Sequence, residues 1–115
     1  DNVDEGNGCV RYLPKSHLHG LRSHVRTETL GFSQGIVDYG TESELDNELA
    51  LCCTPGTLIG HHAITVHRAD RNTSQDRDRR ALGFIYYGAS ARVDEAAHAR
   101  YQSSLSKELQ AQKLI

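Results

Sequence analysis

The chain has 115 residues, of which 15 are acidic and 13 are basic, and it contains no Met and no Trp. A chain of this length buries enough surface for one modest hydrophobic core, which excludes a second catalytic domain. The formal net charge of −2 argues against a dedicated nucleic-acid-binding module, and the apolar stretches are too short to cross a membrane. Because the sequence starts at Asp1 and lacks Met, we expect it to be part of a longer protein.

The first half of the chain predicts short strands separated by a long irregular segment. Residues 9–13 are β-prone and end at a proline. Residues 16–47 are polar and Gly-rich without a sustained period, so we expect a long excursion that contains at most short elements. Residues 48–53 form a second apolar run, and a third strand is expected over residues 57–60 after the turn at Thr54-Pro55-Gly56.

The next stretch predicts two more strands around an arginine-rich loop. Residues 63–67 are short and β-branched, and residues 81–88 are the clearest strand of the chain. Between them, residues 68–80 carry five Arg and three Asp with no apolar stripe, which indicates a solvated loop. The excess of about two positive charges is too small for useful phosphate or nucleic-acid affinity.

A helix is predicted at the end of the sequence. Apolar residues recur there every four positions among polar ones, which is typical of an amphipathic helix from about Asp94 to Lys113, with Asp94 as the N-cap. This stripe consists of Ala97, Tyr101, Leu105 and Leu109. We expect the stripe to cover a sheet or to contact a partner, because the polar face is not rich enough in Lys and Arg for a membrane surface.

Five short strands with one terminal helix favour a mainly β fold, a sandwich or barrel of the jelly-roll type. We expect one domain over residues 1–115, with a β half-barrel over 1–92 and the amphipathic helix over 93–115. The three cysteines, Cys9, Cys52 and Cys53, are odd in number and two are adjacent, so we expect small buried hydrophobes rather than disulfides. Without a targeting segment at the start, these features favour a cytoplasmic protein.

Scattered motifs resemble a known enzyme family. Residues 7–17, 55–58, 62–67, 68–74 and 79–82 together resemble the C-terminal half of the phytanoyl-CoA dioxygenase family of iron(II)- and 2-oxoglutarate-dependent oxygenases. The most specific part is a His after a Gly-led strand, followed by Asn-Thr-Ser and then an Arg just before the next strand.

This resemblance implies a partial double-stranded β-helix, cupin-like, that works with iron(II) and 2-oxoglutarate on a small organic or acyl substrate. The family holds iron with two His and one carboxylate, and His67 matches the second His. An Arg on the following strand clamps the distal carboxylate of 2-oxoglutarate, a bidentate role suited to Arg. Position 79 or 80 supplies it, and we prefer Arg79, because alternation in a strand places the small residues Ala81 and Gly83 beside it.

The sequence departs from the family pattern at the other iron ligands. No His in the chain is followed two residues later by Asp or Glu, so the expected H-x-D motif is absent. We expect that motif upstream of Asp1. Ala69 stands where many members carry a Ser near the cosubstrate, and Asp70 is expected to be a loop residue rather than a replacement ligand. No catalytic residue is assigned within these residues.

Two alternatives remain. If residues 61–67 run straight, His61 and His67 share a face and His62 points away, which permits a weak two-His site for zinc or copper. The chain could also be a non-catalytic half-barrel whose open sheet edges pair with another copy, giving a homo-oligomer.

Overall fold

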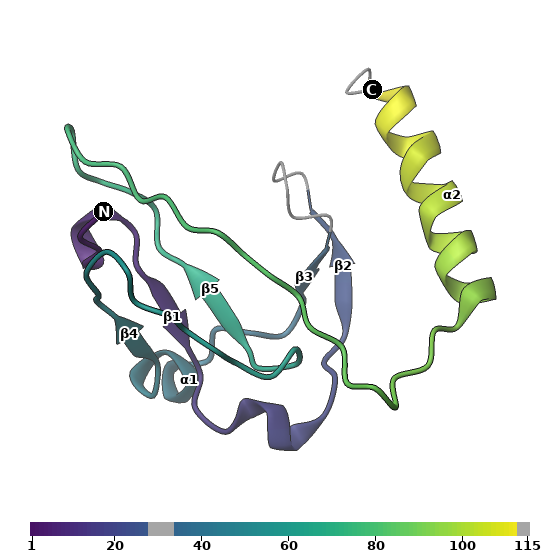
Figure 1. Cartoon of the computed structure of the whole chain (residues 1–115), viewed down its shortest axis with the longest axis horizontal. Helices are drawn as coiled ribbons and strands as arrows, with labels where there is room; N and C mark the ends of the chain where they lie inside the picture. Colours follow the sequence, from purple (N-terminus) through teal and green to yellow (C-terminus); the bar gives the residue numbers. More distant parts are fainter. Residues whose placement is uncertain (28–33, 113–115) are drawn as a thin grey trace. The chain divides into compact units, whose positions relative to one another are not determined.

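A computed structural model of the chain describes residues 1–27 and 34–112 and divides into two compact units, Asp1–Ala81 and Leu82–Ile115 (Figure 1). Two predictions fall partly outside the described residues: the excursion over 16–47 includes residues 28–33, and the predicted helix ends at residue 113. In chain order the elements are the 3-10 helices and strands η1 (Glu5–Asn7), β1 (Val10–Tyr12), η2 (Ser16–His19), β2 (His24–Arg26) and β3 (Gln34–Ile36), then α1 (Glu42–Asp46), β4 (Leu49–Leu51), β5 (His67–Ala69) and α2 (Glu95–Ala111).

The first unit is built on a three-stranded antiparallel sheet in the order β4-β1-β5. Strands β1 and β4 confirm the strands predicted for residues 9–13 and 48–53. In the register of the β1–β5 pair, Tyr12 lies opposite His67. The central strand therefore places an aromatic ring across from the first residue of β5.

Residues 16–47 hold only short elements where the structure describes them, as predicted. Strands β2 and β3 form a separate two-stranded antiparallel sheet with His24 opposite Ile36. The short helix α1 begins with a capping box: the Thr41 side chain accepts the Glu44 backbone N–H at 3.3 Å, and the Glu44 carboxylate accepts the Thr41 backbone N–H at 3.0 Å. The cap of α1 thus depends on residues close in sequence, whereas the ladder between β2 and β3 joins positions as far apart as His24 and Ile36.

The N-terminal turn is tied to the segment that precedes Arg79. The Asp4 carboxylate accepts the Asn7 backbone N–H at 3.3 Å, and the Asn7 side-chain oxygen accepts the Asp4 N–H at 2.8 Å. The buried Asn7 amide also donates to the Asp78 carbonyl at 3.1 Å. This hydrogen bond joins residues 71 positions apart and satisfies a polar group that would be costly to bury alone.

The buried core of the first unit is small. Cys9 and Val66 are its buried hydrophobic residues among those described, and the buried Ser16 hydroxyl accepts the Val66 backbone N–H at 2.8 Å. The expectation of buried thiols is confirmed for Cys9, whereas Cys52 is exposed and Cys53 is half-buried. Successive side chains near a strand point to opposite faces, so adjacent cysteines at the end of the edge strand β4 cannot both face the core.

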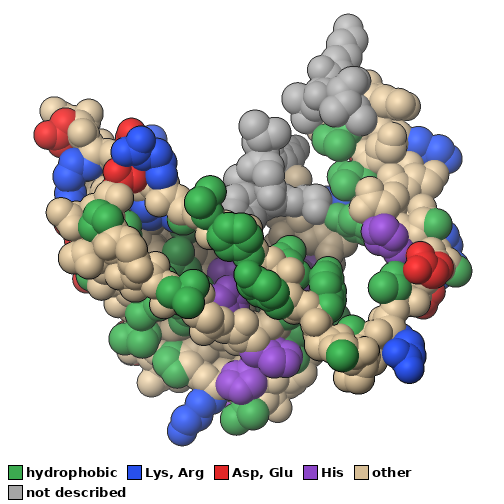
Figure 2. Space-filling view, in the orientation of Figure 1, with side chains coloured by type: hydrophobic (Ala, Val, Ile, Leu, Met, Phe, Trp, Pro, Cys, Tyr) green, Lys and Arg blue, Asp and Glu red, His purple; other side chains and the backbone are tan. Residues whose placement is uncertain are grey.

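Three strand predictions were wrong. Residues 57–60 and 81–88 form no strand, and of the strand predicted over 63–67 only His67 lies in one, as the first residue of β5, which continues into the predicted loop as far as Ala69. β-propensity reflects packing against neighbouring strands rather than an intrinsic backbone preference, and no described strand pairs with these runs. The clearest predicted strand is instead an exposed segment in which Leu82 and Tyr86 are 87% and 89% exposed. Figure 2 shows hydrophobic side chains at the surface of the face in view.

The second unit contains the predicted helix. Helix α2 begins after Asp94, whose carboxylate accepts the Ala97 backbone N–H at 2.9 Å, as predicted for an N-cap. The four stripe residues are half-buried, while most other described positions of the helix are exposed. Within the described ranges, no helix combines the length and apolar character needed to span a membrane. Antiparallel sheets with one long C-terminal helix agree with the predicted mainly β class in outline.

Candidate functional site

A pocket of about 710 Å³ lies within the Asp1–Ala81 unit. Strands β1, β2, β3 and β5 contribute to its wall, together with residues 63–66 and Arg79. The described residues that line it include three guanidinium groups and two imidazoles but no Asp or Glu. These polar residues are Arg22, His24, His67, Arg68 and Arg79. A pocket with this lining favours an anionic ligand.

His67, the predicted iron ligand, lines this pocket at the start of β5. Its Nδ1 lies 2.8 Å from the Thr65 carbonyl oxygen, which can only accept a hydrogen bond. In the neutral imidazole the proton is therefore on Nδ1, and the Nε2 lone pair is available to a metal. The Tyr12 ring is stacked on the imidazole with centroids 5.5 Å apart. The local geometry of His67 thus fits a metal ligand.

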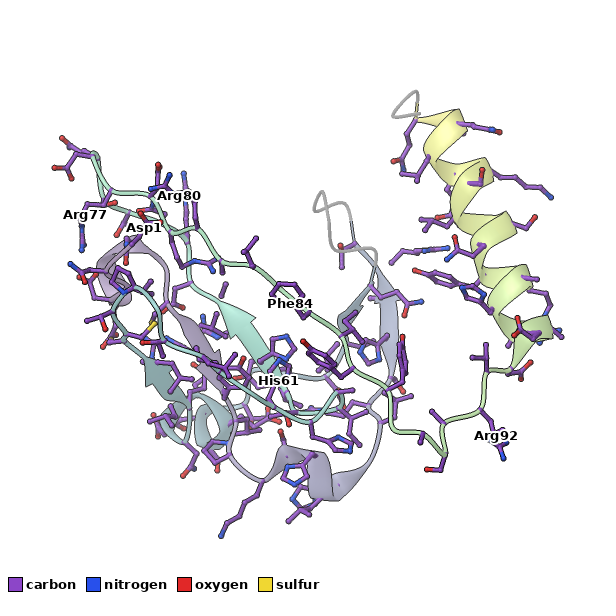
Figure 3. The ribbon with its side chains drawn as sticks, in the orientation of Figure 1. Asp1, His61, Arg77, Arg80, Phe84 and Arg92 are labelled. Atoms are coloured by element: carbon purple, nitrogen blue, oxygen red, sulfur yellow. The ribbon has the colours of Figure 1, made fainter. Side chains whose placement is uncertain are left out.

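Arg79 and Arg80, the two candidates for the cosubstrate clamp, have different surroundings. Arg80 donates to the Asp1 carboxylate through Nη2 at 2.7 Å and Nε at 3.1 Å. Arg79 is half-buried and lines the pocket with His67, and no described carboxylate pairs with it. The predicted strand that would separate their faces does not form, yet the two side chains have separate environments. In Figure 3, Asp1, Arg77 and Arg80 lie together at one end of the first unit.

The other two guanidinium groups of the pocket are neutralised. Arg68 donates to both Glu48 oxygens, at 2.7 and 2.6 Å. Arg22 donates to Glu44 at 2.5 Å and to Asp38 at 3.0 Å, and hydrogen bonding from Arg22 lowers the pKa of Glu44 to about 2. Arg79 is therefore the pocket guanidinium whose charge is available to a bound anion.

Asp70, considered as a replacement iron ligand, is occupied by ion pairs. Its carboxylate accepts Arg11 Nε at 2.5 Å and also bonds to Arg68. The hydrogen bond from Arg11 is the main cause of a lowered pKa for Asp70. Arg11 and Arg68 lie directly opposite each other in the β1–β5 pair, so the like charges require carboxylates nearby. The sequence alone does not reveal this network, because strand register is not visible in composition or periodicity.

The remaining histidines form two ring pairs. His61 and His67 have ring centroids 4.8 Å apart, while His62 is stacked with His17 at 5.6 Å. His61 and His67 therefore lie together and His62 lies apart, although residues 62–65 form a turn rather than a straight strand. In the described part of the chain, no three residues of the types His, Cys, Asp and Glu are grouped to hold a metal. His67 fits one position of an iron site, and these residues do not complete that site.

The fold and pocket define a small antiparallel β unit with an available imidazole and an uncompensated guanidinium facing one cavity. The family model described as phytanoyl-CoA dioxygenase matches residues 1–81, and the chain belongs to this family. The matched range ends where the first compact unit ends. The resemblance inferred from the motifs is thereby confirmed.

Individual relatives give the same result. The chain is 32% identical over 90 residues to phytanoyl-CoA dioxygenase domain-containing protein 1 of Bos taurus, a match that covers 76% of this chain and 30% of that protein. It is 29% identical over 94 residues to the peroxisomal phytanoyl-CoA dioxygenase of Rattus norvegicus, covering 78% of this chain and 26% of that protein. The chain thus matches less than a third of the length of these relatives. No solved structure matches it.

Proposed function

We propose that this chain is the part of an iron(II)- and 2-oxoglutarate-dependent oxygenase that carries the second histidine ligand, His67, and the cosubstrate clamp, Arg79. The observation that carries the proposal is that both side chains line one pocket to which the described residues contribute no carboxylate. Family membership supports the reaction class. The substrate would be a small organic or acyl molecule.

In this proposal the chain's own residues bind and orient. Nε2 of His67 would hold the metal, since the Thr65 carbonyl keeps the proton on Nδ1. The planar fork of Arg79 would bind the distal carboxylate of 2-oxoglutarate in a bidentate manner. Iron(II), when bound, supplies oxygen activation. The remaining ligands and the strands that complete a double-stranded β-helix would come from residues outside this sequence.

The cosubstrate contact is tested by adding 2-oxoglutarate alone to the 115-residue protein and following NMR shifts of the arginine side chains. Weak binding that shifts the Arg79 signals is expected, with loss of binding in Arg79→Gln. Arg80→Gln is the matched control, because Arg80 pairs with Asp1. Binding that survives Arg79→Gln and disappears in Arg80→Gln would contradict the assignment.

A second candidate function is self-association, which the exposed apolar run over residues 82–87 favours. Phe84 and Ile85 are 72% and 80% exposed, and the sequence is strand-forming without a strand partner among the described residues. An identical run in a second copy can pair with it in a two-fold antiparallel arrangement. We propose a homodimer formed in this way.

Light scattering on the purified chain tests this candidate. A dimer that Phe84→Asp converts to a monomer is expected, while Leu58→Asp serves as the control because Leu58 is 92% exposed outside the run. A wild-type monomer at all concentrations would exclude self-association through residues 82–87.

A further inference from the structure

His61 and His67 lie side by side against one aromatic ring. The Tyr12 centroid is 5.0 Å from that of His61 and 5.5 Å from that of His67. The turn between them, closed by the Thr65 N–H donating to the His62 carbonyl at 2.9 Å, reverses the chain and brings position 61 back toward β5. Figure 3 labels His61 beside the ribbon of this strand. The imidazole pair is thus a product of local backbone geometry.

Both imidazoles are held in the form that binds metals. Nδ1 of His61 lies 3.1 Å from the His62 carbonyl oxygen, and Nδ1 of His67 lies 2.8 Å from the Thr65 carbonyl oxygen. A carbonyl oxygen only accepts, so each neutral ring has its proton on Nδ1 and a free lone pair on Nε2. Both side chains are exposed, so an ion can reach them from solvent.

The spacing of the two rings matches a shared ion. Two imidazoles bound at about 2.1 Å to one metal, with an angle of roughly 90–110° between the bonds, have centroids about 4.6–5.3 Å apart. The observed separation is 4.8 Å, with the ring planes tilted by 55°. We propose that His61 and His67 bind one divalent transition-metal ion through their Nε2 atoms.

The second histidine pair lacks the same chemistry and provides a control. His17 and His62 are stacked with centroids 5.6 Å apart. Nδ1 of His62 accepts the Ile64 backbone N–H at 3.3 Å, which places the proton of the neutral ring on Nε2. A metal could bind His62 at Nε2 only if the proton moved from Nε2 to Nδ1, which would break the hydrogen bond from the Ile64 N–H. The pair His61–His67 therefore has both Nε2 lone pairs available to a metal, whereas in the pair His17–His62 the Nε2 atom of His62 carries a proton.

The ligand set determines the class of metal. Two neutral imidazoles, with water in the other positions, favour Cu²⁺, Ni²⁺ and Zn²⁺ over Mg²⁺ or Ca²⁺. No third His, Cys, Asp or Glu of the described residues joins the pair as a metal-binding group. The site shares Nε2 of His67 with the proposed iron site, so the two ions compete for this atom, but the contact from His61 needs only residues of this chain.

The test is calorimetric titration of Ni²⁺ alone into the 115-residue protein carrying Cys52→Ser, which removes an exposed thiol. One Ni²⁺ per chain is expected, with paramagnetic broadening of the His61 and His67 ring signals. His61→Gln and His67→Gln should each weaken binding at least about tenfold, because each removes one of two imidazole ligands. His62→Gln should leave binding unchanged.

Three results would overturn the site: no Ni²⁺ binding by the Cys52→Ser protein, unchanged affinity in His61→Gln, or loss of binding in His62→Gln. Circular dichroism of each variant shows whether the fold is retained. His61→Gln also separates this inference from the proposed function, since it should weaken Ni²⁺ binding at least about tenfold and leave the 2-oxoglutarate shifts of Arg79 intact.

Discussion

The two units of the chain are stabilised in different ways. In Asp1–Ala81, hydrogen bonds and ion pairs join residues far apart in sequence, such as Asn7 with Asp78 and Ser16 with Val66. In the second unit, hydrogen bonds of the described residues join near neighbours in sequence, such as the cap between Asp94 and Ala97 and the contact of Ser104 with Glu108. The family match covers the first unit and ends with it. Non-local bonds therefore coincide with the part of the chain that carries the candidate site.

This difference predicts where substitutions will be costly. A change in the first unit removes contacts on which several segments depend, so unfolding should be cooperative there. A change in the second unit should act on the helix alone, because a 17-residue helix with local bonds is marginal in water. Substitutions in each unit and unfolding in acid test this contrast.

The largest effect is expected for Gly8→Ala. Gly8 has a φ of +87°, and a Cβ at this position would lie 2.6 Å from the Asp70 carbonyl oxygen. Left-handed strain and a clash with backbone together should lower the free energy of unfolding by at least about 3 kcal/mol. Denaturant unfolding measures this loss.

Gly56→Ala is the matched control for Gly8→Ala. Gly56 has a φ of +88°, but nothing lies within 4 Å of its added Cβ. Only the backbone strain of about 1 kcal/mol should remain. Equal losses in the two variants would show that the approach of Asp70 to Gly8 is unimportant.

A somewhat smaller loss is expected for Glu48→Gln. The Glu48 side chain is only 2% exposed and pairs with both nitrogens of the Arg68 fork. Removing its charge leaves Arg68 with Asp70 as its remaining carboxylate partner among the described residues, and we expect a loss of about 2 kcal/mol. Glu42→Gln, on the exposed surface of α1, should change stability little. Similar unfolding midpoints for both variants would contradict a role for the network.

A weaker effect is expected from acid. Hydrogen bonding from Arg77 lowers the pKa of Asp4 to about 2, and hydrogen bonding from Arg22 lowers the pKa of Glu44 to about 2. Since these folded-state values lie below the ordinary carboxyl range of about 4, their stabilisation is complete above that range and is lost as pH falls toward 2. Unfolding measured between pH 5 and about pH 2 should show this decline, and the double variant Asp4→Asn with Glu44→Gln should flatten it. If the stability of the double variant fell as steeply with pH as that of the wild type, the attribution of the acid effect to Asp4 and Glu44 would be wrong.

The smallest effect on global stability is expected for Asp94→Ala. Its carboxylate caps α2, and the cap contributes about 1 kcal/mol to the helix. Helical circular dichroism should fall while the unfolding midpoint of the first unit stays unchanged. Asp94→Asn keeps a capping oxygen and should preserve the signal. A shift of the midpoint of the first unit would show that the helix is coupled to it.

The elements that could be predicted correctly from the sequence are those specified by residues close in sequence or by a strong local periodicity. The four-residue apolar repeat and Asp94 located α2, and the proline after residues 9–13 ended β1. The run over residues 81–88 has the same strand-forming composition, but a strand also needs a partner, and none is found among the described residues. Composition could not show that difference.

The residues of the candidate site also fall into those that the sequence identified and those that only the structure revealed. Motif order identified His67 and Arg79 as the residues of interest, and these assignments remain part of the proposal. Sequence reasoning missed Tyr12, because its position opposite His67 depends on the register of two strands that are distant in the chain. It also missed the role of Asp70, because its partner Arg11 lies 59 residues away.

The sequence by itself determined the family and the terminal helix. It also identified His67 and Arg79 as the residues that match the family's second iron-binding histidine and its cosubstrate-binding arginine. The tertiary structure decided which charges are free. Arg22 and Arg68 are neutralised by carboxylates and Arg80 by Asp1, whereas Arg79 faces the pocket without a described carboxylate partner. The physical reason is that charge compensation acts over a few ångströms in space, and neighbours in space are not neighbours in the chain.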